Sequence, residues 1–332
     1  MYIFVEYMLW HHILHFIHFG NLLPIGRDPI YRVRGEKKRM NYMAFGQILV
    51  NWLLLSSLYA AVAVGFSLVW GIMNIVNLAH GAFIVVGAYI AFWMYTQLHI
   101  DPYVGILLTM AALFTIGWLV QYIAINRVIR APLLVTFLFT FGLNLLITDL
   151  VQQIFSSDLR SINTTYAGSG FNIGSIHIAF DSLITATIAV SLTAALSYFL
   201  SRTRTGNAIL ATGMDRDAAR LMGINIGHMY ALTFGIGAAL AGAAGAMFAE
   251  LYPFNPSEGG AFTLRAFVIV VLGGLGTPWS AIAGGLAFGF AETVIPLLPN
   301  VGSGYDDAIA FAVLVAVLVF KPNGLLGKAF YS

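Results

Sequence analysis

Long apolar segments separated by short polar stretches dominate the chain from residue 47 onward. A helix needs ~20 apolar residues to cross the hydrocarbon core of a bilayer, and several of these segments reach that length. The pattern predicts an all-α fold, a polytopic transmembrane helical bundle with about eight spans. The apolar segments are residues 47–70, 78–98, 103–125, 133–155, 183–200, 229–251, 262–275, 281–297 and 307–320.

Glycine and proline interrupt the apolar segments in both halves of the chain. Non-helical backbone at membrane depth is tolerated only where protein or a water-filled cavity surrounds it. Interrupted segments in both halves are typical of transporters built from two inverted repeats around a midplane site. We therefore expect broken or re-entrant helices. Two inverted repeats fit this pattern, although the halves show no residue-by-residue similarity.

The composition supports a membrane protein and excludes several functional classes. Hydrophobic residues make up 59% of the 332 residues and charged residues 9%, far from the balance of a soluble domain. The absence of cysteine excludes disulfides, thiolate metal sites and cysteine nucleophiles. No GxxxxGK phosphate-binding loop followed by Ser or Thr is present, so we expect any ATP hydrolysis to take place on another chain.

Residues 1–39 form an N-terminal extension that is first apolar and rich in histidine and then basic. Its histidines have helical i, i+3 and i+4 spacings, which suit a metal site. They are His11, His12, His15 and His18. We favour two simpler explanations, an interfacial anchor or an upstream extension from a misplaced start, with Met40 or Met43 as the usual first residue. We therefore expect no metal on the chain, and a transmembrane domain over residues 40–332.

The positions of lysine and arginine predict the orientation in the membrane, because basic loops are cytoplasmic. Basic clusters lie before the first span, at Arg127 and Arg130, across residues 202–220, and at Lys321 and Lys328. Residues 156–181 and 296–306 then lie outside, and the turn 273–278 is cytoplasmic. Between Arg39 and Arg127, however, three apparent spans occur where an even number is required. Either the stretch 70–81 is broken or re-entrant, or the N-terminus lies outside.

Two asparagines and a histidine lie inside the apolar stretch 71–81, as Asn74, Asn77 and His80, followed by Gly81. Polar groups at membrane depth are costly unless they are paired, so they line a pathway or bond between helices. We weigh these two roles equally. Glu292 in the eighth apolar segment also indicates a lined interior, so these five residues are our candidates for a translocation pathway.

The longest basic segment between spans, residues 202–227, contains an acidic residue, two alanines and a later glycine. This spacing predicts a short helix with a small face that seats in a groove of a partner protein. An ordinary solvated loop is the alternative. The candidate docking residues are Asp215, Arg216, Asp217, Ala218, Ala219, Arg220 and Gly223.

A rigid turn at 252–256 should face the outside, flanked by Glu250 and Arg265 and containing Asn255. These three residues are candidates for an outer gate or a docking contact. Charge pairing inside the membrane or snorkelling explains the two charges equally well. Asn144 and Asp149 are further polar candidates on the fourth apolar segment.

Several of these motifs, in this order, resemble the LivH/LivM-type permeases of bacterial ABC importers for branched-chain amino acids, amides and urea. The resemblance covers residues 47–327. Its most specific elements are 71–81 continuing into Ala88 and Tyr89, the segment 204–224 with Gly206, the turn 272–278, and the end 321–327.

The resemblance implies a multi-pass protein of the bacterial inner membrane that is a transport subunit and not an enzyme. It implies a second permease of the same type, two P-loop ATPases that bind ATP and magnesium, a periplasmic solute-binding protein, and no nucleic-acid partner. No cofactor is implied on this chain. Permeases of this class contact the ATPase through an EAA-x3-G pattern, which corresponds here to Asp217-Ala218-Ala219 and Gly223, with Asp in place of Glu.

Two other functions fit the residues less well. An ion-coupled secondary transporter needs an intramembrane carboxylate, for which Glu292 and Asp149 are the candidates. An intramembrane enzyme around His80 would need a nucleophile elbow, an HExxH motif or a carboxylate at helical spacing, none of which the sequence contains.

Overall fold

The computed structural model describes residues 42–294, except 130, 175, 275 and 276, and also residues 311, 312, 315, 319 and 324–326. The predictions for the extension 1–39, the outer stretch 296–306, Lys321 and Lys328 therefore lie outside the described residues. So does most of the predicted span 307–320.

Helices make up most of the described chain, and seven helical stretches in it are long and apolar enough to cross a membrane. The prediction of a polytopic helical membrane protein is confirmed. The long helices are α2 (Tyr42–Met73), α3 (His80–Leu98), α4 (Pro102–Val120), α6 (Leu133–Phe155), α7 (Phe180–Arg202), α10 (Ile226–Leu251), α11 (Gly259–Gly273) and α12 (Pro278–Val294). A π-turn, η1 (Gln121–Ile125), and α5 (Asn126–Val128) continue α4, and a 3-10 turn, η2 (Pro256–Glu258), precedes α11.

Side-chain caps define where several helices begin. Asp101 accepts a hydrogen bond from the backbone N–H of Tyr103 at the start of α4, where Pro102 occupies the first helical position. Asn225 accepts one from the N–H of His228 at the start of α10. The Asp and Asn side chains accept hydrogen bonds from backbone N–H groups that have no partner within the helix. Proline suits the first helical position because it has no N–H group to satisfy.

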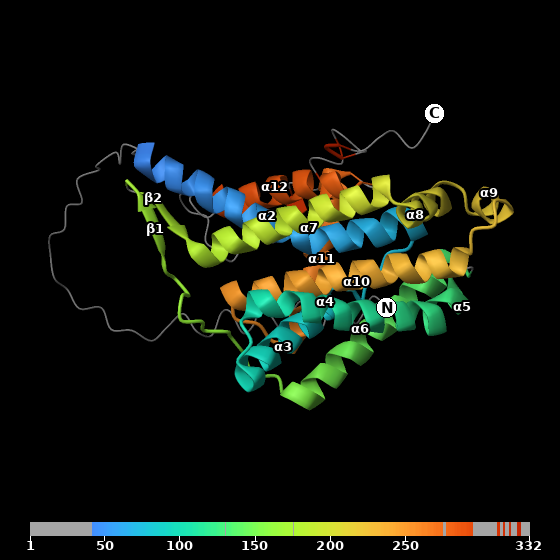
Figure 1. Cartoon of the computed structure of the whole chain (residues 1–332), viewed down its shortest axis with the longest axis horizontal. Coiled ribbons are helices and arrows are strands. Elements are labelled where there is room, and N and C mark those ends of the chain that lie inside the picture. The colour runs from blue at the N-terminus through green and yellow to red at the C-terminus, as the bar shows by residue number, and fades with distance from the viewer. Residues whose placement is uncertain are drawn as a thin grey trace, which may run out of the picture. The chain divides into compact units, whose positions relative to one another are not determined.

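Helix α10 is the centre of the bundle. It lies between α2 and α7 on one side and α3 and α4 on the other (Figure 1). Its glycines allow this packing: Gly245 meets the carbonyl of Ile84 in α3, and Gly242 meets Leu113 in α4. Close approach through small residues is how membrane helices gain packing energy without a hydrophobic drive.

A short hairpin interrupts the otherwise helical chain between α6 and α7. Strand β1 (Gly170–Ile173) pairs antiparallel with β2 (Ile176–Ala179). The all-α prediction did not include this hairpin. Gly174, between two short runs of alternating apolar residues, is the sequence signal for this hairpin. Its φ in the structure is 65°, a value that suits a tight hairpin turn.

The bundle has two chemically different ends. We call the one with the β1–β2 hairpin the hairpin end, and the other, with α5, α8 (Arg204–Met214) and α9 (Arg216–Leu221), the basic end (Figure 1). The basic end carries Arg127, Arg202, Arg204, Arg216 and Arg220.

The start of α2 lies at the hairpin end, which bears on the three apparent spans found between Arg39 and Arg127, where an even number was expected. The side-chain amide of Gln47 donates to the carbonyl of His177 (2.9 Å) and accepts from its N–H (2.7 Å). Helices α2, α3 and α4 therefore pass three times between residue 42 and Arg127. Contrary to our expectation, the start of α2 and Arg127 therefore cannot both lie on the cytoplasmic side. The stretch 70–81 is broken, and an outside N-terminus stays a prediction.

Candidate functional site

The break between α2 and α3 is formed by residues 74–79, which run without helical structure. Asn74 has a positive φ of 53° and ends α2, with its N–H still bonded to Trp70 O (2.9 Å). Asn77 is buried, and its side-chain oxygen accepts from the N–H of Ala79 (3.1 Å) just before α3 begins. The two asparagines therefore shape the break itself, and Asn74 is the exposed one.

Threonines from other helices satisfy the backbone of the break. Thr263 in α11 accepts from the N–H of Gly81 (2.8 Å) and donates to Leu78 O (3.0 Å). Thr140 in α6 donates to Val76 O (3.2 Å). Sequence reasoning missed both threonines, because nothing in their local sequence indicates which backbone they meet.

His80 and Gly81 attach the first turn of α3 to its neighbours. The His80 ring is buried, its Nε2 lies 2.9 Å from Val62 O of α2, and Phe66 packs edge-on against it. A Cβ at Gly81 would collide with the carbonyl oxygen of Gly259. These contacts match the interhelical bonding that we weighed for this motif, and a role in the pathway stays a prediction.

The predicted docking segment folds as α8 and α9 at the basic end. The Asp215 side chain caps α9 by accepting from the N–H groups of Asp217 (2.9 Å) and Ala218 (3.0 Å). Ala219 is buried against the bundle, and Gly223, with φ at 83°, follows α9 in a left-handed conformation. Of the two residues of the predicted small face, Ala219 packs inward and Ala218 is exposed, so the docking role of this face stays a prediction.

Large apolar side chains form the outward surface of this segment. Met214 and Leu221 are each 88% exposed and Met222 is 83% exposed. We call these three residues the apolar knob. Sequence reasoning missed them, although three large apolar residues within a basic loop were a visible signal. Exposed apolar side chains at the end of a membrane protein are typical of a contact with another protein or with the membrane.

A pocket of about 350 Å³ lies beside α9. Its lining residues include Arg127, Arg216, Arg220, Asp217 and the buried Tyr230. Among the described residues none of these three arginines forms an ion pair with a carboxylate. Three arginines and one aspartate therefore line a pocket beside α9, and Leu221 of the apolar knob follows Arg220 directly in the chain.

At the hairpin end Asn255 and Arg265 share a partner, because Asn255 Nδ2 donates to Glu258 Oε1 (3.2 Å) and Glu258 interacts electrostatically with Arg265. Glu250 is 5% exposed and accepts a hydrogen bond from Thr164 Oγ1 (2.7 Å). Asn255 caps the turn that follows, accepting from the N–H of Ser257 (2.9 Å). Arg265 lies further along α11, where its electrostatic interactions include Glu258 and the hydroxyl of Tyr59.

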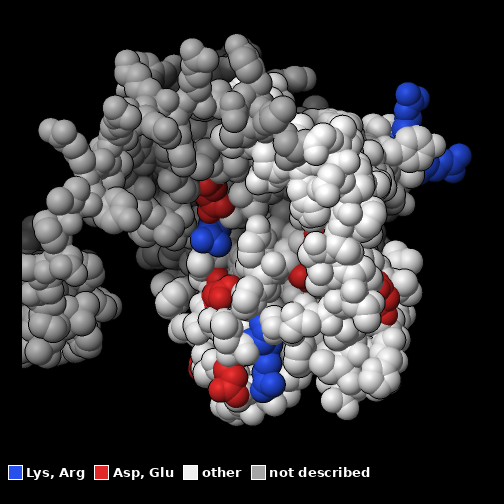
Figure 2. Space-filling model, turned by 90° about the vertical axis from the view of Figure 1, so that its left-hand side faces the viewer, with Lys and Arg blue, Asp and Glu red and all other residues white. Residues whose placement is uncertain are grey.

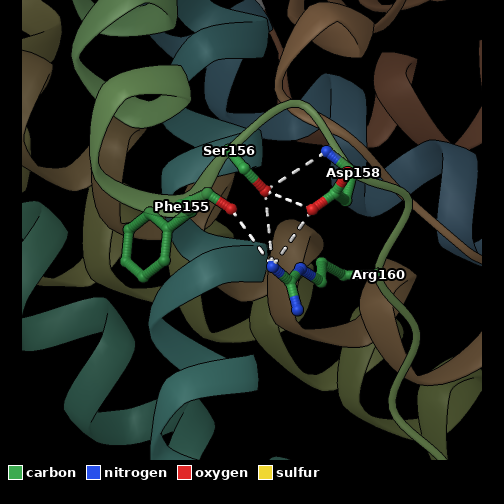
Figure 3. Close-up of polar contacts among 4 residues, drawn as sticks. All are labelled: Phe155, Ser156, Asp158 and Arg160. Carbon is green, nitrogen blue, oxygen red and sulfur yellow. Dashed lines mark hydrogen bonds and ion pairs between the residues drawn. The ribbon is translucent and has the colours of Figure 1, made fainter.

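Arg160 ties the connection between α6 and β1 to the bundle (Figure 3). Its guanidinium donates to Phe155 O (3.3 Å), lies 3.6 Å from the Asp158 carboxylate and covers the ring of Phe92. Its backbone pairs in both directions with Phe254 at 2.8 Å. Viewed from this end, the basic groups near the middle of the face lie directly beside acidic ones (Figure 2).

Glu292 belongs to a polar group inside the membrane-spanning part. The Tyr59 hydroxyl of α2 donates to its carboxylate, and Arg265 acts electrostatically on the same hydroxyl. A pocket of about 320 Å³ lies next to this group, lined in part by Asn51, Tyr252 and Thr293. The pathway candidates therefore separate into a buried break and this polar group toward the hairpin end.

Seven apolar helices long enough to cross a membrane, with a helix break stabilised by buried hydrogen bonds, define a multi-pass membrane protein. The family model described as the permease component of branched-chain amino acid transport systems matches residues 48–318, and the chain belongs to this family. It is thus a permease subunit of an ABC importer, which confirms the resemblance and favours it over an ion-coupled carrier or an intramembrane enzyme.

The chain is similar over most of its length to curated relatives. It is 33% identical over 295 residues to the high-affinity branched-chain amino acid permease BraD of Pseudomonas aeruginosa, covering 85% of this chain and 95% of BraD. It is 30% identical over 304 residues to LivH of Escherichia coli, covering 86% and 97%. A shorter match, 29% over 171 residues, is to the autoinducer 2 import permease LsrC of Yersinia pestis, covering 49% and 45%. No solved structure matches the chain significantly.

Proposed function

We propose that the chain imports a branched-chain or similar aliphatic amino acid across a bacterial inner membrane, as one of two permeases in an importer driven by cytoplasmic ATPases. The names of BraD and LivH, both matched over most of their length, support this solute class. The positive-inside rule supports a cytoplasmic basic end and a periplasmic hairpin end, where a solute-binding protein delivers its cargo.

The apolar knob on α8 and α9 carries the proposal for ATPase contact. Exposed Met214, Leu221 and Met222 flank α9, and Arg216 and Arg220 lie between them in the chain, a mixture of apolar and basic residues that suits a protein interface. Since α9 is capped by Asp215 and anchored through buried Ala219, force applied to the knob is transmitted to α10 and the bundle.

Solute movement is proposed along the group of Tyr59, Glu292 and Arg265 and the adjoining pocket of about 320 Å³. Their position in the half of the bundle nearer the hairpin end supports a role early in import, before the break between α2 and α3. A zwitterionic amino acid needs both a cationic and an anionic partner, and these charges supply that chemistry.

The test is to tag the chain at its C-terminus, extract it gently from native membranes and identify the proteins that co-purify. Recovery of P-loop ATPases with the wild-type chain is expected. Leu221→Glu should reduce ATPase recovery about tenfold or more, because a charge at the centre of an apolar contact removes a hot spot. Asp217→Arg should abolish uptake while the chain still inserts.

Ile173→Glu is the matched control, since Ile173 is an apolar residue 60% exposed at the hairpin end. It should leave ATPase recovery unchanged. Full ATPase recovery with Leu221→Glu would remove the knob from the contact. Recovery of the wild-type chain without any ATPase, under conditions that preserve other complexes, would overturn the proposal in favour of an ion-coupled carrier.

A further inference from the structure

Helix α6 is the least enclosed of the spans in the described chain. Only 17% of its apolar window is buried within the subunit, compared with 89% for α10. Leu134, Leu138 and Leu146 are each more than half exposed. A spanning helix with so few contacts is covered either by lipid or by another protein.

One exposed stripe of α6 has the spacing of a helix–helix contact. We call it the α6 seam, and its residues are Leu138, Gly142, Leu145 and Asp149. They follow each other by four, three and four positions, which is the period of two helices that pack side by side. A Cβ at Gly142 would meet nothing within 4 Å, so the glycine leaves an open notch on the outer surface.

Asp149 argues against a seam that faces lipid alone. It is exposed on the spanning helix, six residues or about 9 Å before its end at Phe155. No hydrogen bond or ion pair to Asp149 is present among the described residues. Carboxylates within spans almost always face protein or water, because burying them in hydrocarbon is costly, and their side chain is too short to snorkel.

We infer that the α6 seam packs against the second permease subunit of the importer, and that this subunit presents a hydrogen-bond donor or a basic side chain opposite Asp149. The glycine notch at Gly142 accepts a close helix, and the polar pair at Asp149 sets its register. The inference deepens the proposed function, since it rests on the second permease.

A different chain suits the seam better than a second copy. Two copies related by a two-fold axis along the membrane normal would bring the two Asp149 carboxylates to one level at the shared interface. Like charges facing each other in a medium of low dielectric repel strongly. A non-identical permease avoids this repulsion by supplying the complementary group.

The test uses a photo-reactive amino acid placed at Leu145 on the seam of the tagged, full-length chain in native membranes. The expected result is an adduct with a second, different permease. Leu107 on α4 is the matched control, because it is a leucine 73% exposed on another span, and a probe there should give no adduct with that permease. Asp149→Asn should weaken the Leu145 adduct about tenfold, within the range of interhelical polar contacts.

Each other outcome overturns the inference in a distinct way. An adduct between two copies of this chain would make the pair homomeric. A protein adduct from Leu107 and none from Leu145 would place the interface on α4. If the ATPases co-purify but Leu145 captures no permease, the seam fails and the proposed function stands. If neither ATPases nor a second permease are recovered, both fail.

Discussion

Helices α10 and α6 have similar lengths and are both strongly apolar, yet they occupy opposite situations in the bundle. Nearly all of α10 is enclosed by its neighbours, whereas α6 lies at the edge, although α6 is the more hydropathic of the two. Figure 1 shows α10 between two layers of helices and α6 outside them. Apolar character therefore shows that a helix enters the membrane, but it does not show where in the bundle the helix lies.

The difference lies in the size of the side chains. Residues 235–246 of α10 are nearly all glycine or alanine, so several backbones can come close to it at once. In α6 the corresponding surface is made of leucine and phenylalanine, with a glycine that nothing contacts. Many small residues on an apolar helix indicate that it lies at the centre of the bundle. Within a membrane, helices associate through close packing and not through the hydrophobic effect.

The largest effect is expected from Gly245→Ala in α10. The added Cβ would collide with the Ile84 carbonyl and would lie 2.8 Å from the Ala88 nitrogen. Backbone atoms of α3 cannot move without disturbing the helix, so we expect a loss of about 1–3 kcal/mol in the free energy of unfolding, as for overpacked cores. The thermal midpoint of the purified chain in detergent measures it. An unchanged midpoint would contradict the close approach of α10 and α3.

An intermediate effect is expected from Thr263→Val in α11, a helix whose burial lies between that of α10 and α6. The change removes the partner of the Gly81 N–H and of the Leu78 carbonyl. Polar contacts between membrane helices are worth about 0.6–1.7 kcal/mol, so the midpoint should fall by less than with Gly245→Ala.

Thr115→Val is the control for that experiment. The Thr115 hydroxyl is exposed and donates only to Ala111 O of its own helix (2.9 Å). Equal losses from the two valines would show that the break between α2 and α3 does not depend on Thr263. A loss confined to Thr263→Val would assign the difference to the bonds across helices.

The sequence predicted local features of the fold well. The span 133–155 coincides with α6, because Pro132 and the left-handed Ser156 end it clearly on both sides. The break at 74–79 was visible in its asparagines. The direction of α2 could not be predicted from the sequence. The positive-inside rule uses only the charges near a span, whereas the contact of Gln47 with His177 shows at which end of the bundle the helix begins.

The candidate site was predicted less completely, for a physical reason. Asp215 and Gly223 act through their own neighbours in the chain, so their roles can be read locally. Thr263 acts on residues 182 positions away, and Glu250 bonds with Thr164 across 86 positions. Such pairings depend on which helices become neighbours. The spacing of residues within one segment gives no information about that.

The smallest effect is expected from Gly142→Ala in α6, the same substitution as in α10. The new Cβ meets nothing within 4 Å, and alanine favours a helix over glycine by about 1 kcal/mol, so the isolated chain should be unchanged or slightly more stable. Unfolding of the purified subunit in detergent, measured beside Gly245→Ala, checks this. A destabilised Gly142→Ala subunit would mean that α6 is enclosed by its own chain, and the contrast between the two helices would disappear. An unchanged subunit that assembles less well with its partners would instead locate the missing contacts of α6 in another protein.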